Sequence, residues 1–204
     1  MKKIVRILLV VLVTMAALGA SALVYLKSTG LVARSSPGAL ETSVARAARR
    51  LAVPRAARER QNPIAPGPEV MAEGRAHFAD HCASCHANDG SGNTEMGRSL
   101  FPPAPDMATV SQALTDGELF YVIEQGVRFT GMPAWGTGTP AGEEASWQLV
   151  HFIRHLPQIT PEEVEEMAAM NPRSPADVRQ EIEAERFLQG DDPAPAEPSA
   201  AHVH

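Results

Sequence analysis

Apolar residues are distributed along the chain at spacings that predict helices. Residues 7–26 are almost uninterruptedly apolar, and 20 residues of helix span about 30 Å, the thickness of the hydrocarbon core of a membrane. Lys2, Lys3 and Arg6 precede this run. Basic residues favour the cytoplasmic side, so the remainder of the chain is expected to face the periplasm. The pattern predicts a single-pass inner-membrane protein.

A cleaved signal peptide is the alternative interpretation of residues 1–26. Small residues at 20–22 resemble a cleavage site. The apolar run, however, continues to Leu26, which is longer than a signal peptide needs. We therefore expect a retained anchor, and in either case an exported remainder.

Residues 27–67 are expected to form a basic linker that contains one amphipathic helix. An apolar stripe at steps of four and three residues is formed by Leu40, Val44, Ala47 and Leu51. Pro54 is expected to end or kink this helix. Such a helix lies on a membrane or against a partner helix, or is a solvated spacer. The sequence leaves both interpretations open.

Residues 68–158 are expected to form the main domain. A first helix begins at Pro68 and leads directly into Cys82, a second begins at Thr115 with Glu118 completing a capping box, and a third runs from Thr139 to about Leu156. A loop rich in Gly and Pro over residues 88–113 joins the first helix to the second. Strand signals are scarce, so the predicted fold class is all-α.

Two further helices are predicted beyond this domain. Thr160-Pro161 and Ser174-Pro175 each place a capping residue before a proline and an acidic first turn. We interpret residues 159–189 as a charged helical extension on the surface. Residues 190–204, rich in Pro, Ala and acidic residues, are expected to be a disordered tail.

Charge divides the chain into two parts. Residues 1–62 carry eleven Lys or Arg and two acidic residues, a net charge of +9, whereas residues 63–204 carry seven basic and 22 acidic residues, a net charge of −15. A basic stalk suits anionic lipid, and an acidic head suits a basic protein partner. Nucleic acid is an improbable partner for an acidic domain.

The cysteine pattern indicates a covalently bound haem. The two cysteines of the chain lie in Cys82-Ala83-Ser84-Cys85-His86, a Cys-x-x-Cys-His motif typical of haem attachment. Its thiols reach two edges of one porphyrin, and the adjoining imidazole reaches the iron. A redox dithiol or half of a zinc site fits less well, because there is no βαβ pattern and no second Cys/His pair at a suitable spacing.

The region resembles the class I c-type cytochromes. Gly74 and Phe78 precede Cys82 at four-residue steps, which is similar to the family's first helix, and residues 147–154 are similar to its last helix. The resemblance implies a close crossing of these helices at Gly74. It also implies one haem c per chain, held by Cys82 and Cys85, with His86 as one iron ligand.

The same resemblance implies Met132 as the second iron ligand. Gly131-Met132-Pro133 resembles the family's distal methionine loop, 46 residues after His86. Met96 and Met107 are alternatives that lack this Gly/Pro frame. A proline carbonyl is expected to accept a hydrogen bond from His86, with Pro102, Pro103 and Pro105 as candidates. Arg128 and Trp135 flank the loop and are candidates for contact with haem propionates.

Histidines at four-residue spacing occur twice outside the motif, at positions 77 and 81 and at positions 151 and 155. The spacing is compatible with metal binding. Because no third ligand is evident, we expect surface or packing roles for all four.

The function expected from these features is electron transfer by a membrane-tethered, single-haem carrier without catalytic residues of its own. Its partners would be a membrane-bound donor and a terminal oxidase or reductase. An alternative is a haem-bearing structural subunit of a membrane oxidoreductase, similar to the small subunit of nitric oxide reductase. A gas sensor or enzyme would need an open iron site, which a second axial ligand removes.

Overall fold

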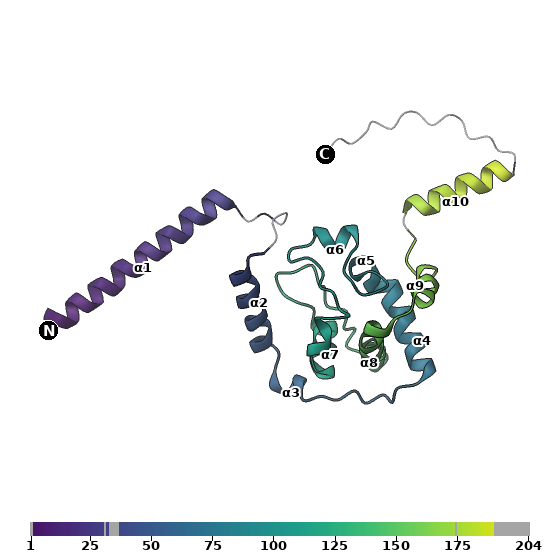
Figure 1. Cartoon of the computed structure of the whole chain (residues 1–204), viewed down its shortest axis with the longest axis horizontal. Helices are drawn as coiled ribbons and strands as arrows, with labels where there is room; N and C mark the ends of the chain where they lie inside the picture. The colour runs from purple at the N-terminus through teal and green to yellow at the C-terminus, as the bar shows by residue number, and fades with distance from the viewer. Residues whose placement is uncertain (1, 31, 33–36, 174, 190–204) are drawn as a thin grey trace.

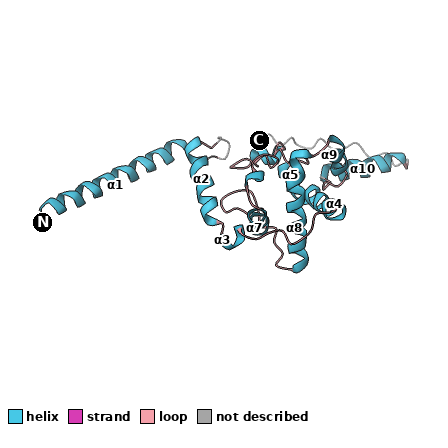
Figure 2. Ribbon diagram, turned by 60° about the horizontal axis from the view of Figure 1, so that its bottom comes forward, coloured by secondary structure: helices cyan, strands magenta, loops and turns pink. Residues whose placement is uncertain are grey.

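The computed structural model describes residues 2–30, 32, 37–173 and 175–189 (Figure 1). Within those ranges every regular element is a helix and none is a strand (Figure 2). The predicted all-α class is therefore confirmed. The figures show a helical head from which one long helix extends at the N-terminal end.

The extended helix is α1 (Lys2–Thr29), the apolar segment expected from the sequence. An 18-residue window within it has a mean hydropathy of 2.6, and none of this window is buried inside the molecule. Its length and composition are those of a membrane-crossing helix. The helix continues three residues beyond the predicted end at Leu26.

The core of the head is the crossing of α4 (Pro68–His77) with α8 (Pro140–His155), which make the most extensive contact between two helices. A Cβ at Gly74 would lie 2.4 Å from the Gln148 carbonyl oxygen, so only glycine permits this approach. The rings of Phe78 and Phe152 pack beside it, with centroids 5.2 Å apart. The close crossing implied by the family resemblance is confirmed.

The helix α7 (Asp116–Gln125) begins with the predicted capping box. The Thr115 hydroxyl accepts a hydrogen bond from the Glu118 N–H (3.2 Å), and the Glu118 carboxylate accepts one from the Thr115 N–H (2.9 Å). These bonds satisfy backbone donors that an uncapped helix leaves unpaired. Phe120 of this helix stacks on Trp147 of α8, with ring centroids 4.1 Å apart.

The first helix differs from the prediction in its last turn. It widens after α4 into a π-helix, η1 (Phe78–Cys82), and returns to α-helix in α5 (Ala83–His86). The expected helical path into Cys82 is confirmed, whereas the π-helical geometry of its last turn was not predicted. A π-turn takes up an extra residue, and the neighbours Phe78 and Ala79 are both completely buried in this turn.

The loop over residues 88–113 contains two short helices that the sequence analysis did not predict. They are α6 (Glu95–Ser99) and the 3-10 turn η2 (Ser111–Ala113). Elements of five and three residues are too short to produce a hydrophobic period, so the pattern of the sequence does not reveal them.

The linker contains the predicted amphipathic helix, α2 (Ala39–Ala52), which ends before Pro54 as expected. The short helix α3 (Arg55–Arg58) comes next and packs against α7. A Cβ at Gly117 would lie 2.0 Å from the Ala57 carbonyl oxygen, which shows how closely the two backbones approach.

Residues 53–64, which we call the strap, continue along the head. Val53 is buried, and the guanidinium of Arg60 lies 4.3 Å from the centre of the Phe120 ring. Asn62 Nδ2 donates to the Trp147 carbonyl at 2.9 Å. The second half of the linker is thus a bound part of the head.

The C-terminal helices differ in how they pack. α9 (Pro161–Ala168) buries Met167 completely in the core, and its Glu166 pairs with Arg75 of α4 at 2.8 Å. The helix therefore contributes to the head, although its outer face is charged. α10 (Pro175–Leu188) is exposed along its described side chains. The predicted cap Ser174 and the tail 190–204 lie outside the described residues.

Candidate functional site

The Cys-x-x-Cys-His segment lies where η1 passes into α5, at the C-terminal end of the first helix of the head. Cys82 and Cys85 are both free thiols and are half-buried. Burial raises the pKa of the Cys82 thiol to about 12, and the neighbouring Cys85 contributes to the rise. Redox-active dithiols need a lowered pKa, so this environment disfavours that alternative.

His86 is half-buried, and its buried Nδ1 atom has no hydrogen-bond partner of good geometry among the residues that the structure describes. Burial lowers the pKa of the imidazole, whereas the carbonyl of Pro105 opposes this by favouring the protonated ring. Of the three candidate prolines, Pro105 is thus the one whose carbonyl acts on His86. A neutral imidazole is the form that binds a metal.

The short helix α6 supports the motif from the outside. A Cβ at Gly97 would lie 2.2 Å from the Cys85 carbonyl oxygen. The Thr94 hydroxyl donates to that oxygen at 3.2 Å and accepts from the Gly97 N–H at 2.8 Å. The sequence analysis did not predict these contacts of Thr94 and Gly97 with the Cys85 carbonyl. The available signal was a capping threonine followed three residues later by glycine, which is too common a pattern to identify a site.

The backbone of the methionine loop between α7 and α8 is held by several hydrogen bonds. The Val127 N–H donates to the Met132 carbonyl at 3.1 Å. The Thr130 hydroxyl accepts from the Met132 N–H at 3.1 Å and donates to the Val127 carbonyl at 2.7 Å. Met132 itself is half-buried. Its position is therefore defined by the loop and not by burial in the core.

The structure brings the methionine loop next to the cysteine motif. The imidazole of His81 and the indole of Trp135 meet edge to face, with ring centroids 5.2 Å apart. A Cβ at Gly131 would lie 2.5 Å from a methyl carbon of Leu100, in the loop after the motif. Two segments about 50 residues apart in sequence thus form one side of the head.

The alternative methionines lie in different surroundings. Met96 is 54% exposed on α6. Met107 packs against the hydrophobic core, and its N–H donates to the Gly90 carbonyl at 2.7 Å. Met132 differs from Met96 in being half-buried, and from Met107 in not packing against the hydrophobic core cluster among the described residues.

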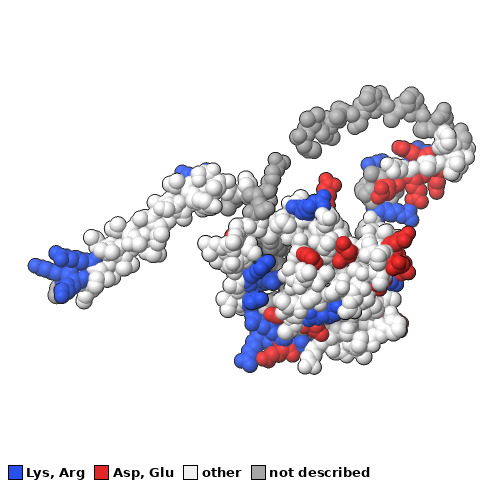
Figure 3. All heavy atoms as spheres, in the orientation of Figure 1, with Lys and Arg blue, Asp and Glu red and all other residues white. Residues whose placement is uncertain are grey.

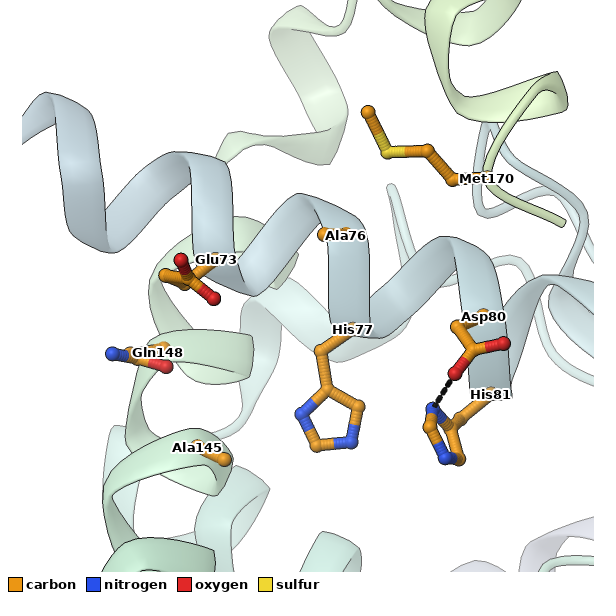
Figure 4. A pocket seen from close by; sticks show the side chains of 8 residues that line it. All are labelled: Glu73, Ala76, His77, Asp80, His81, Ala145, Gln148 and Met170. Atoms are coloured by element: carbon orange, nitrogen blue, oxygen red, sulfur yellow. Dashed lines mark ion pairs between the residues drawn. The ribbon is translucent and has the colours of Figure 1, made fainter.

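The remaining histidines make local contacts. His77 and His81 project from the same side of the helix, beside a pocket between α4 and α8 that Met170 also lines (Figure 4). Their rings lie 4.8 Å apart, and His81 Nδ1 lies 3.1 Å from Asp80. Among the described residues, no group of three His, Cys, Asp or Glu side chains is placed to hold a metal ion.

The second histidine pair is engaged in packing contacts. The Nε2 atom of His151 is hydrogen-bonded to the Ile64 carbonyl at 2.8 Å, and that of His155 to the Glu163 carboxylate at 2.9 Å. Of the two candidate propionate contacts, Arg128 is exposed, whereas Trp135 packs against the core cluster.

These features fit a covalently attached haem. The free thiols lie three residues apart beside a buried, unpaired imidazole nitrogen, and a thioether lies in a hydrogen-bonded loop on the same side of the head. A buried polar atom without a partner is uncommon in folded proteins. Among the described residues Nδ1 of His86 has no partner of good geometry, which fits a ring that becomes fixed only when its other nitrogen binds a metal.

Comparison with known proteins agrees with this site. Residues 69–153 match the family model described as cytochrome c oxidase, cbb3-type, subunit III. The chain is also similar to the cbb3-type cytochrome c oxidase subunit FixP of Rhizobium meliloti (strain 1021), with 34% identity over 90 residues. FixP of Sinorhizobium medicae (strain WSM419) is 38% identical over 92 residues.

These matches cover 44% of this chain and 28% of each relative, so the chain spans only about a quarter of the length of the curated relatives it matches. The matched region is the helical head, which contains the Cys-x-x-Cys-His segment and the methionine loop, and α1 is the apolar helix that precedes it. The protein is therefore a membrane-anchored c-type cytochrome.

Proposed function

We propose that the protein is a single-haem electron carrier at the periplasmic face of the inner membrane. It takes electrons from a membrane-bound donor and passes them to a terminal oxidase or reductase. One observation carries the proposal: the chain's single Cys-x-x-Cys-His segment and its methionine loop lie on one side of the head, joined by the contact of His81 with Trp135.

Four side chains hold the haem in this proposal. Cys82 and Cys85 would hold haem c through two thioether bonds, and His86 and Met132 would be the protein ligands of its iron. When bound, the haem supplies a one-electron redox centre. His86 binds as a neutral imidazole oriented by the Pro105 carbonyl, as metal-bound histidines commonly are. The uncharged thioether of Met132 favours ferrous iron and so raises the potential.

The chain has no catalytic residues in this proposal. With His86 and Met132 both as iron ligands, the protein would leave no open iron position for a substrate or for O₂. The head then needs only to hold the haem, exclude water from it and present a docking surface. Residues 63–158 carry a net charge of −7 and residues 159–204 of −8, which suits a basic partner. Electron-transfer rates with such a partner should fall as ionic strength rises; rates that stay flat would contradict charge-guided docking.

A second candidate is a permanent haem subunit of a membrane oxidoreductase. It is favoured by the relatives, which are subunits of a cbb3-type oxidase by name. Extraction from native membranes with a mild detergent, followed by size measurement, separates the candidates. A carrier leaves the membrane alone, and a subunit leaves with larger partners.

Carbon monoxide binding tests the proposed iron ligands. The ferrous wild-type protein should bind CO slowly and weakly, because both axial positions are occupied. Met132→Leu should bind CO readily, whereas Met96→Leu and Met107→Leu should behave as wild type. Fast CO binding by the wild type, or by the Met107 variant alone, would show that Met132 is not the ligand. A colourless mature protein with the mass of its amino acids alone would rule out covalent haem.

A further inference from the structure

We propose that α2 is a lipid-docking helix that lays one side of the cytochrome head on the membrane surface next to the anchor. The stripe that enters the lipid interface consists of Leu40, Val44, Ala47 and Leu51. This inference concerns how the head is held and does not depend on its electron-transfer partners.

The stripe is exposed in the structure. Leu40 is 78%, Val44 60% and Leu51 85% exposed, although each is a large apolar side chain. Single exposed apolar residues are common on protein surfaces, but a continuous apolar face marks an interaction site. The head itself therefore does not cover this face of α2.

The opposite face of α2 is turned toward the head. Thr42 and Arg49, two turns apart, are half-buried while the residues of the stripe are exposed. At 100° per residue these two positions lie roughly opposite the centre of the stripe. Burial and the charge of Arg50 lower the pKa of Arg49, and Glu118 opposes this shift, so Arg49 lies near the first turn of α7.

The same glutamate connects the strap to this contact. Glu118 caps α7 and forms an ion pair with Arg58 of α3 at 3.6 Å. The strap is thus paired with the first turn of α7, and Arg49 of α2 lies within electrostatic range of the same glutamate. The half-buried side of α2 is the one that carries Arg49, so the apolar stripe points away from the head.

The short connection to the membrane anchor α1 makes lipid the expected occupant of this apolar stripe. Nine residues separate Thr29, the end of α1, from Ala39, the start of α2, a span of about 30 Å at most. In both views α2 runs across the line of α1 instead of continuing it (Figures 1 and 2). Because α1 crosses the membrane in this proposal, a helix that runs across its line and begins this close to it is placed to lie along the membrane surface.

Charge supports the same occupant. Residues 27–60 contain eight basic and two acidic residues, and basic side chains gather over α2 and α3 (Figure 3). Arg50 is exposed about 90° from the centre of the stripe, and Arg46 is exposed further round the helix. An apolar face bordered by arginines is typical of helices that lie in the interface of anionic membranes.

The test uses the full-length, haem-loaded protein reconstituted in vesicles of phosphatidylethanolamine and phosphatidylglycerol. Tryptophan is placed in the stripe by Val44→Trp and, as a matched control, on the next residue by Ala45→Trp. Both positions are exposed, but they face about 100° apart. Each variant is measured in lipids with and without brominated acyl chains, and the wild-type emission is subtracted.

Brominated chains should quench the emission of the Val44→Trp variant by about twofold or more and leave that of the Ala45→Trp variant nearly unchanged, because only the stripe reaches the acyl region. Equal quenching of the two variants, or none in either, would overturn the proposal. The second result would mean that another protein or only water covers the stripe.

A second variant tests docking on lipid without an introduced tryptophan. Replacing Leu40, Val44 and Leu51 together by serine leaves α1 and the strap unchanged. In vesicles, trypsin cleavage after Arg46 and Arg50 should become several-fold faster than in wild type, and Ser43→Ala should not change it. An unchanged cleavage rate in the triple variant would contradict docking on lipid.

Discussion

The imidazole of His81 stands perpendicular to the indole of Trp135, with ring centroids 5.2 Å apart and planes at 90°. His81 precedes the first cysteine of the haem motif, and Trp135 comes three residues after Met132. The contact thus joins the two segments that supply the proposed iron ligands.

This contact should appear as a coupling between the two residues. Edge-to-face ring pairs contribute about 0.5–1.5 kcal/mol, so a double-mutant cycle with His81→Ala and Trp135→Ala should give a coupling in that range. The measurement is denaturant unfolding of the haem-loaded protein. As a control, His151→Ala, which removes a hydrogen bond to Ile64, should be additive with Trp135→Ala. Additivity in the His81 cycle would mean that the ring contact contributes nothing.

Thr130 is predicted to position Met132. Its hydroxyl accepts the Met132 N–H and donates to the Val127 carbonyl, so Thr130→Val removes both bonds, at roughly 1 kcal/mol each. We expect the ferrous variant to bind CO faster than wild type while its helical circular dichroism is unchanged. Thr109→Val, which removes an exposed hydroxyl bonded to Asp106, is the matched control. If both variants bind CO as wild type does, Thr130 does not hold the ligand loop.

Gly74 is predicted to be intolerant of any side chain. Gly74→Ala would put a Cβ within 2.4 Å of the Gln148 carbonyl oxygen, which forces α4 and α8 apart. Overpacking of this kind lowers the free energy of unfolding by about 1–3 kcal/mol. Gly67→Ala, at the cap of the same helix with open space around its Cβ, should change it little. Similar stabilities of the two variants in denaturant unfolding would refute the close crossing.

Glu163 is predicted to make the stability of the head pH-dependent. Burial raises its pKa, but hydrogen bonds from His155 and the Thr160 N–H, with the positive charges of His155 and Arg75, outweigh this and lower it below the ordinary 4.5. The folded-state pKa is thus below the unfolded value, so the stabilisation is present above about pH 4.5. It is lost as the pH falls through the folded-state pKa.

Replacement of this carboxylate tests the sign of the effect. Glu163→Gln should lower the free energy of unfolding at pH 7 by about 1 kcal/mol, because it weakens a helix cap and an ion pair. Its stability should also fall less steeply than that of wild type below pH 4.5. Glu162→Gln, one residue earlier on the exposed side of the same turn, is the control. Parallel pH profiles for wild type and Glu163→Gln would contradict the prediction.

Local features of the fold can be derived directly from the sequence. Thr115 with Glu118 and Thr160 with Glu163 form the capping boxes that their spacing indicates, because a cap is decided by residues within one turn. The apolar period of α2 and the long apolar run of α1 are predictable for the same reason. The Cys-x-x-Cys-His motif carries its chemistry within five consecutive residues, so the sequence alone indicates the type of cofactor.

Contacts between distant segments depended on the tertiary structure. The sequence offered three prolines for His86, and only the packed loop brings the Pro105 carbonyl to its ring. The strap, the support of Cys85 by Gly97, and the side of α2 that faces the head likewise join residues that no local pattern relates. Sequence periodicity reports which face of a helix is apolar, whereas only packing decides whether that face is covered by the head or left for another surface.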